Sequence, residues 1–133
     1  MNLDIIPCLN DNYSYLIQDK HSGKVAIIDP SEFGPCNDII SQKYKKLDFI
    51  LNTHHHDDHI GGNLDLKKKY NSKIVCSHHD KNIIVDADIL LNDGDSFKFG
   101  EIDFNVLHIH SHFFPSGPFT KLYLGSFQQY FPS

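Results

Sequence analysis

The feature that most constrains the fold is the run Thr53 to Asn63, THHHDDHIGGN, which stands between an apolar segment and an amphipathic one. The segment before it, Phe49 to Leu51, is short and apolar, as expected for a buried strand. Two glycines break the chain near the end of the run, and Asn63 to Tyr70 predicts a helix with Leu64 inward and lysines outward. A strand that passes through a polar turn into a helix is typical of an α/β fold.

Further elements are expected on both sides of this unit. Leu3 to Pro7 and Tyr13 to Ile17 flank a turn-rich Asn10-Asp11-Asn12 and predict a hairpin. Val25 to Asp29 predicts a buried strand, and Pro35 opens a predicted helix that runs through Tyr44. The later predictions are a strand at Ile74 to Cys76, a turn at Asn92-Asp93-Gly94, and a hairpin of Ser96 to Phe99 with Ile102 to Leu107. The sequence therefore predicts an α/β class with antiparallel pairs at both ends.

The composition fits one soluble globular domain. The chain has 133 residues, of which 40% are hydrophobic and 22% are charged. A net charge of −5 and the lack of a basic stripe argue against a nucleic-acid surface. No apolar run has the length of a membrane span, and the N-terminus does not resemble a signal peptide. Cys8, Cys36 and Cys76 have no CxxC spacing, which predicts reduced thiols in a cytoplasmic protein.

The histidines of the run are spaced to bind a metal ion. On an extended chain alternate side chains share one side, so His54 and His56 can reach one ion together. Asp58 falls on that side again, and His59 follows at the start of the turn. Imidazole nitrogens and carboxylate oxygens suit zinc and other first-row divalent ions. The alternative is a histidine-rich surface loop, which the preceding buried strand and the closing Gly61-Gly62 disfavour.

Two residues of the run are not expected to be ligands. His55 projects away from His54 and His56, so we expect it to be packed or to support a ligand. Asp57 is likewise expected to face solvent or to lie behind the ligands.

The run resembles the signature of the metallo-β-lactamase superfamily. The opening IPCLNDNYSYLI (Ile6 to Ile17) is similar to that of the hydroxyacylglutathione hydrolases, and AIIDPSE (Ala26 to Glu32) and LNDGDSFKFG (Leu91 to Gly100) stand in the expected order. The resemblance covers about residues 1 to 112. It implies a metallo-β-lactamase-like αββα sandwich, of which this chain would hold the first half only.

The resemblance also implies a role for five residues. His54, His56 and His112 would bind a first ion. Asp58 and His59 would bind a second ion, and Asp58 would also act in catalysis by orienting the nucleophile. Zinc is the expected metal, and iron or manganese are the alternatives for mixed His/Asp ligands.

Three neighbouring residues would not be ligands. His108 and His110 fall on positions that are not ligands in the family. Asp29 would lie below the site as a supporting carboxylate. The implied reaction is hydrolysis of an S-(2-hydroxyacyl)glutathione thioester to a 2-hydroxy acid and glutathione, so the expected partner is that small molecule.

The resemblance stops at His112. Residues 113 to 133 contain no Asp, Glu or His, so they cannot supply the later ligands that complete the family's second ion. We therefore expect an incomplete domain over residues 1–112 and an atypical tail over 113–133, frame-shifted or disordered. One retained ion, weak or absent turnover, and self-association through an uncovered sheet face would follow. The alternatives are a non-catalytic remnant that binds one ion, or a metallo-hydrolase of another substrate such as a lactam or a phosphodiester.

Overall fold

The chain forms a main sheet whose strands follow one another in chain order. The computed structural model describes residues 1–9, 12–52, 60–92, 95–107, 112–115, 119–124 and 127–132, with side chains described through residue 103. The strands of the main sheet are β1 Asn2–Cys8, β2 Asn12–Gln18, β3 Val25–Ile28, β4 Phe49–Leu51, β5 Lys73–Ser77 and β6 Ile89–Leu91. Strands β1 to β3 pair antiparallel, whereas β3 to β6 pair parallel.

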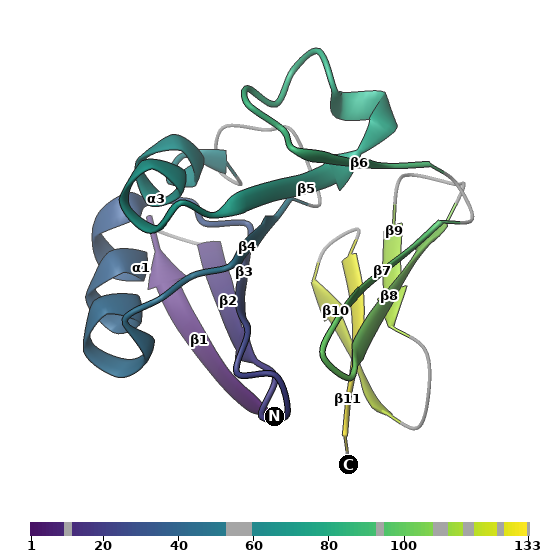
Figure 1. Cartoon of the computed structure of the whole chain (residues 1–133), viewed down its shortest axis with the longest axis horizontal. Helices are drawn as coiled ribbons and strands as arrows, with labels where there is room; N and C mark the ends of the chain where they lie inside the picture. Colours follow the sequence, from purple (N-terminus) through teal and green to yellow (C-terminus); the bar gives the residue numbers. More distant parts are fainter. Residues whose placement is uncertain are drawn as a thin grey trace.

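The two faces of this sheet are covered by different layers. Helices α1 (Phe33–Ile39) and α3 (Asn63–Tyr70) lie on one face, as Figure 1 shows, and α1 continues as the π-helical turn η1 (Ile40–Tyr44). The other face is turned toward a second group of strands. These are β7 Ser96–Phe99, β8 Ile102–Leu107 and β9 His112–Pro115 in one sheet, and the pair β10 Phe119–Leu124 and β11 Phe127–Pro132. The predicted α/β sandwich is confirmed, with layers in the order helix, sheet, sheet.

Each central strand sends its side chains alternately into two cores. Ile27 of β3, Ile50 of β4 and Ile74 of β5 are fully buried on the helix side. Their neighbours Ile28 and Leu51 are buried in the core that faces the second sheet. Because side chains alternate along a strand, a sheet covered on both faces needs continuous apolar strands, which is what the sequence shows.

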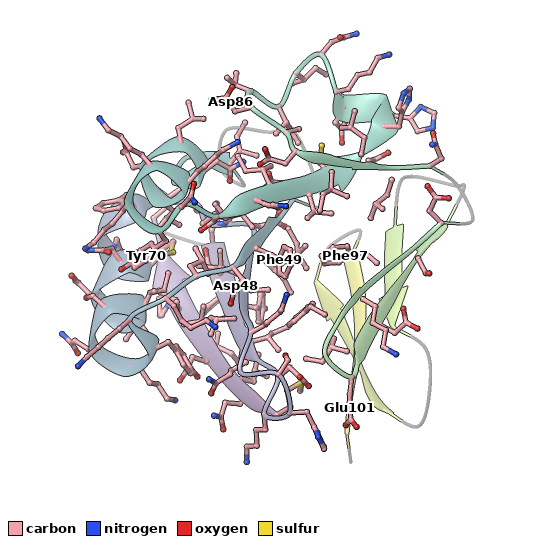
Figure 2. All side chains as sticks on the ribbon, viewed as in Figure 1. Asp48, Phe49, Tyr70, Asp86, Phe97 and Glu101 are labelled. Atoms are coloured by element: carbon pink, nitrogen blue, oxygen red, sulfur yellow. The ribbon has the colours of Figure 1, made fainter. Side chains whose placement is uncertain are left out.

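Aromatic rings join the two sheets. The rings of Phe49 on β4 and Phe97 on β7 meet edge to face, with centroids 5.0 Å apart and planes at 81° (Figure 2). The ring centroid of Phe99 lies 5.9 Å from that of Phe49, and Phe99 is 2% exposed. Such edge-to-face pairs add to the stabilisation that burial provides.

Most predicted elements are confirmed. The first hairpin, the strands at residues 25–28 and 49–51, the helix Asn63–Tyr70 and the hairpin of residues 96–107 form where they are expected. The helix predicted from Pro35 begins earlier, at Phe33, and its last part is the turn η1. The predicted turn at Asn92-Asp93-Gly94 falls partly on residues 93 and 94, which lie outside the described residues.

One prediction about the helix α3 is wrong. Leu64 is 47% exposed, whereas Leu66 is fully buried against the main sheet. The lysines Lys68 and Lys69 are exposed, as predicted. Sequence patterns also do not indicate β6, whose three residues follow a loop. Both differences concern short elements, in which one turn or one strand residue changes which side chain faces the core.

A buried carboxylate ties the main sheet to the second one. Asp19, at the end of β2, is 3% exposed and accepts hydrogen bonds from the amide and hydroxyl of Ser22 at 2.8 and 2.7 Å. Its other oxygen accepts from the amide of Glu101, 3.2 Å away in the β7–β8 turn. Glu101 marks that turn in Figure 2. Gly100 makes the approach feasible, because it has a φ of +61° and no side chain.

Asp19 and Asp88 predict how stability depends on pH. Burial alone would raise the pKa of Asp19, but its hydrogen bonds outweigh burial and hold that pKa below the ordinary 3.8. Burial also acts to raise the pKa of Asp88, and hydrogen bonds from Lys67 and the Ile74 amide lower it overall. A carboxyl with a lowered folded pKa stabilises the fold above its unfolded pKa, and this contribution is lost as pH falls through the folded pKa.

We therefore expect the free energy of unfolding to fall as pH is lowered below about 4. Urea titrations across this range measure it, and Asp88→Asn should flatten the slope because it removes one of the two groups. An unchanged slope in that variant would contradict the assignment.

An apolar strip on β1 and β2 stays uncovered on the side of the second sheet. Ile5 and Tyr13 are 55% and 56% exposed, and Leu3 is 36% exposed. Leu3 pairs with Ile17 across the strands, which places it on the side of the core between the sheets. Self-association through this strip stays a prediction. Among the described helices, none has the length and apolar character needed to cross a membrane.

Candidate metal centre

The carboxyl ends of the parallel strands meet at one edge of the main sheet, where buried polar residues gather. Asp29 follows β3, Asn52 follows β4 and Ser77 ends β5, with exposed fractions of 4%, 1% and 2%. The amide of Asp29 donates to the Leu51 carbonyl at 2.9 Å, and the amide of Asn52 donates to Val75 at 3.0 Å. The backbone ladder thus continues past the strand ends. In open α/β sheets, binding sites form at this edge.

The histidine-rich run leaves the sheet at the same edge, directly after Asn52. Residues 53–59 lie outside the described residues, and Ile60 is the first described residue after them. The predictions that fall on this segment are the ligands His54, His56, Asp58 and His59 and the non-ligand roles of His55 and Asp57. They stay predictions.

The third predicted ligand of the first ion opens a strand of the second sheet. His112 begins β9, and its backbone pairs opposite Leu107 of β8. Its side chain lies outside the described part, as do His108 and His110. Convergence of His112 with the run therefore stays a prediction. Among the residues that the structure describes, no group of three His, Cys, Asp or Glu side chains could hold a metal ion.

Asp29 has an unusual backbone at this edge. Its φ is +50°, a left-handed conformation that costs a residue with a Cβ about 1–2 kcal/mol. Its carbonyl accepts hydrogen bonds from the hydroxyls of Ser14 at 2.7 Å and Ser31 at 3.4 Å. The Ser31 amide donates to the Ser14 hydroxyl at 3.2 Å. The supporting role of Asp29 beneath the candidate centre stays a prediction.

The second glycine of the run is required by close packing. The Gly62 amide donates to the Pro30 carbonyl at 2.7 Å. A Cβ on Gly62 would lie 3.0 Å from that carbonyl oxygen and 3.1 Å from the carbonyl carbon of Glu32. Both contacts are with backbone atoms, which cannot rotate away. The end of the run at Gly62 therefore packs against the chain that enters α1.

The three cysteines are free and buried, as the sequence predicts. Burial, together with the nearby Cys8 thiol, raises the pKa of Cys36 to about 12, and burial raises that of Cys76 to about 12. The sulfurs of Cys8 and Cys36 are 3.8 Å apart. Cys36 and Cys76 are therefore protonated thiols near neutral pH in the metal-free protein.

Sequence reasoning passed over the polar residues that surround the run. Asn52, directly before the run, and Asn63, its last residue, face each other with their side-chain amides. The visible signal was an asparagine at each end of the run. His78 and His79 follow β5 at the same edge. The His79 amide donates a hydrogen bond to the Ser77 hydroxyl at 3.2 Å.

Comparison with known proteins identifies the family. The sequence profile of the Metallo-beta-lactamase superfamily matches residues 9–117. This chain belongs to the metallo-β-lactamase superfamily. Membership implies that a divalent metal ion, typically zinc, is bound.

The curated relatives that this chain matches come from one group of proteins within the superfamily. A hydroxyacylglutathione hydrolase of Pelagibacter ubique is 44% identical over 112 residues, which are 84% of this chain and 47% of that protein. One of Rhodopseudomonas palustris is 41% identical over 111 residues, or 84% of this chain and 44% of that protein. This chain therefore spans about half the length of the curated relatives it matches.

Solved structures share the fold at lower identity. ETHE1 from Myxococcus xanthus has a TM-score of 0.66 and 23% identity, over 86% of this chain and 56% of that one. The class B3 di-zinc metallo-β-lactamase LRA-12 from an Alaskan soil metagenome also has a TM-score of 0.66 and 23% identity, over 80% and 49%. These likenesses show the fold alone.

Proposed function

We propose that this chain contributes the metal-binding part of a hydrolase of S-(2-hydroxyacyl)glutathione thioesters. The observation that carries the proposal is the run THHHDDHIGGN directly after β4, at the carboxyl edge of the parallel strands. The 44% identity to a relative named hydroxyacylglutathione hydrolase supports the substrate class. The products would be a 2-hydroxy acid and glutathione.

The residues of the run have the chemistry that the proposed metal needs. His54, His56 and His112 would supply three imidazole nitrogens to a first ion, and Asp58 and His59 would begin a second site. Zinc accepts this mixture of nitrogen and carboxylate donors, and iron or manganese are the alternatives.

Each group would have a distinct part in the reaction. A bound divalent ion would polarise the thioester carbonyl and lower the pKa of water. Asp58 would orient the attacking water and accept its hydrogen bond. Asp29 would support the site from the end of β3.

We further propose that the first ion is held more tightly than the second. This chain carries three proposed ligands for the first ion and two for the second, and a catalytic zinc normally has three protein ligands. Turnover by this chain alone is therefore expected to be weak or absent. The second candidate function, a non-catalytic remnant that binds one ion, is favoured by the same ligand count.

Metal analysis of three proteins tests the proposal. After chelation, reloading with zinc and gel filtration, the parent chain should hold about one ion, and His56→Ala should lose it. The matched control is His21→Ala. The side chain of His21 is 72% exposed. In the part of the chain that the structure describes, its one ion pair is with the exposed carboxylate of Glu101. This variant should keep the ion. A parent chain without zinc, or equal loss in both variants, would refute the metal site.

A turnover assay separates the candidate functions. Hydrolysis of S-D-lactoylglutathione by the zinc-loaded chain, abolished in Asp58→Asn, would favour the hydrolase over the remnant. A β-lactam and a phosphodiester in the same assay address the other substrate classes. Turnover of either in place of the thioester would overturn the proposed substrate.

The state of the cysteines supports a cytoplasmic location, which we also propose. Free buried thiols are what a reducing compartment preserves.

A further inference from the structure

The asparagine before the histidine-rich run and the asparagine that ends it form a reciprocal amide pair. The Nδ2 of Asn52 donates to the Oδ1 of Asn63 at 3.1 Å, and the Nδ2 of Asn63 donates to the Oδ1 of Asn52 at 2.5 Å. Both residues are buried, with 1% and 4% exposure. A side-chain pair at these positions joins the first residue before the run to its last residue.

Each end of the run is also anchored to a different neighbour. At the start, the Asn52 amide donates to the Val75 carbonyl of β5 at 3.0 Å. At the other end, the Gly62 amide donates to the Pro30 carbonyl, which follows β3, at 2.7 Å. Asn63 then begins α3, and the Gly62 carbonyl accepts the Leu66 amide at 3.1 Å. The segment between the asparagines thus leaves from one fixed point and returns to another.

This arrangement sets the distance and direction between the two ends of the run. His54 is two residues after Asn52, and His59 is four residues before Asn63. Few rotatable bonds therefore separate the amide pair from the proposed ligands. Groups that hold metal ligands in place typically tune metal affinity about 10- to 100-fold without touching the ion.

We propose that Asn52 and Asn63 are positioning residues that preorganise the metal-binding run by closing its two ends. The inference deepens the proposed function and rests on it. Neither asparagine need contact the ion, because the pair acts through the chain between them. Because each side chain both donates to and accepts from the other, replacing either asparagine by alanine removes both hydrogen bonds of the pair.

Three variants and one control test the pair. Asn52→Ala, Asn63→Ala and the double variant each remove the pair. Ser72→Ala is the matched control, because Ser72 is 2% exposed and donates one buried hydrogen bond to the Leu47 carbonyl at 2.7 Å. Ser72 and Leu47 precede β5 and β4, at the opposite edge of the sheet.

Cobalt affinity and the cobalt absorption spectrum are the first readouts. Each Ala variant should bind Co²⁺ about 10- to 100-fold more weakly in competition with a chelator, with an altered visible spectrum. The double variant should be no weaker than the single ones, because the two residues act as one unit. Ser72→Ala should match the parent in both readouts. Parent-like affinity and spectrum in the Asn variants would overturn the proposal.

Amide hydrogen exchange in the metal-free protein is the second readout, and it separates this inference from the proposed function. Exchange across residues 53–62 should be faster in Asn52→Ala than in Ser72→Ala. A parent chain that binds no cobalt would refute the proposed metal site, and with it the positioning of ligands, whatever the exchange result. If an Ala variant does not fold, Asn63→Asp gives the same comparison, since it keeps the acceptor for Asn52 and loses only the donor. Equal exchange in that variant and the parent would refute closure of the run.

Discussion

Replacing Gly100 by alanine is expected to lower the free energy of unfolding by about 2–4 kcal/mol. A Cβ at this position would clash with the carboxylate of Asp19, and the φ of +61° is strained for any L side chain. The carboxylate must then move away from the amides of Ser22 and Glu101, from which it accepts hydrogen bonds at 2.8 and 3.2 Å. Urea unfolding of the variant and the parent measures the loss.

Two other glycines separate the causes of this effect. Gly23 has a φ of +75°, and a Cβ added there would meet no atom within 4 Å, so Gly23→Ala tests the backbone strain alone. It should cost about 1 kcal/mol. Gly34 lies in α1 with open space around it, so Gly34→Ala should be neutral or slightly stabilising. Equal effects in all three variants would show that contact with Asp19 is not what Gly100 protects.

Truncation of Leu66 should be the most damaging change on α3. Leu66 is fully buried beneath the helix, among residues of the main sheet and α1, so Leu66→Ala should cost about 2–5 kcal/mol. Leu64→Ala is the matched control, because the same substitution on the same helix removes a side chain that is 47% exposed. The control should lie within about 0.5 kcal/mol of the parent. Thermal and urea unfolding measure both, and similar losses in the two variants would contradict the placement of the helix.

The difference between Leu64 and Leu66 shows where sequence reasoning about the fold stops. The sequence predicts the helix Asn63–Tyr70 with correct bounds, because glycines precede it and lysines fill its last turn. It does not predict the rotation of the helix about its own axis, since an eight-residue helix with two leucines gives a weak periodic signal. The buried strands are easier to predict, because a strand covered on both faces has no polar position to misplace. The three-residue β6 has too few residues to show any pattern.

The candidate centre can be predicted as a list of ligand types but not as a geometry. The residue types of the run THHHDDHIGGN predict a metal site. The match to the metallo-β-lactamase superfamily confirms the family that the run indicated. The reciprocal amides of Asn52 and Asn63 are not visible in the same way, because an asparagine in a sequence does not indicate its partner. The same holds for Asp19, whose hydrogen bond to Glu101 spans 82 residues. Such long-range polar contacts depend on the assembled sheets.

The order of the main sheet also has a consequence for how the chain assembles. Each of its six strands pairs with the next one along the chain, so no strand must wait for a distant segment to arrive. Because each strand pairs with one that precedes it along the chain, the sheet can grow stepwise as residues leave the ribosome, with a crossover before each of the parallel strands β4, β5 and β6. The asparagine pair, separated by 11 residues, can close as soon as α3 has emerged. A chain with this strand order can therefore pair the strands that carry the histidine-rich run before its later strands are synthesised, and the third proposed ligand, His112, joins when β9 forms.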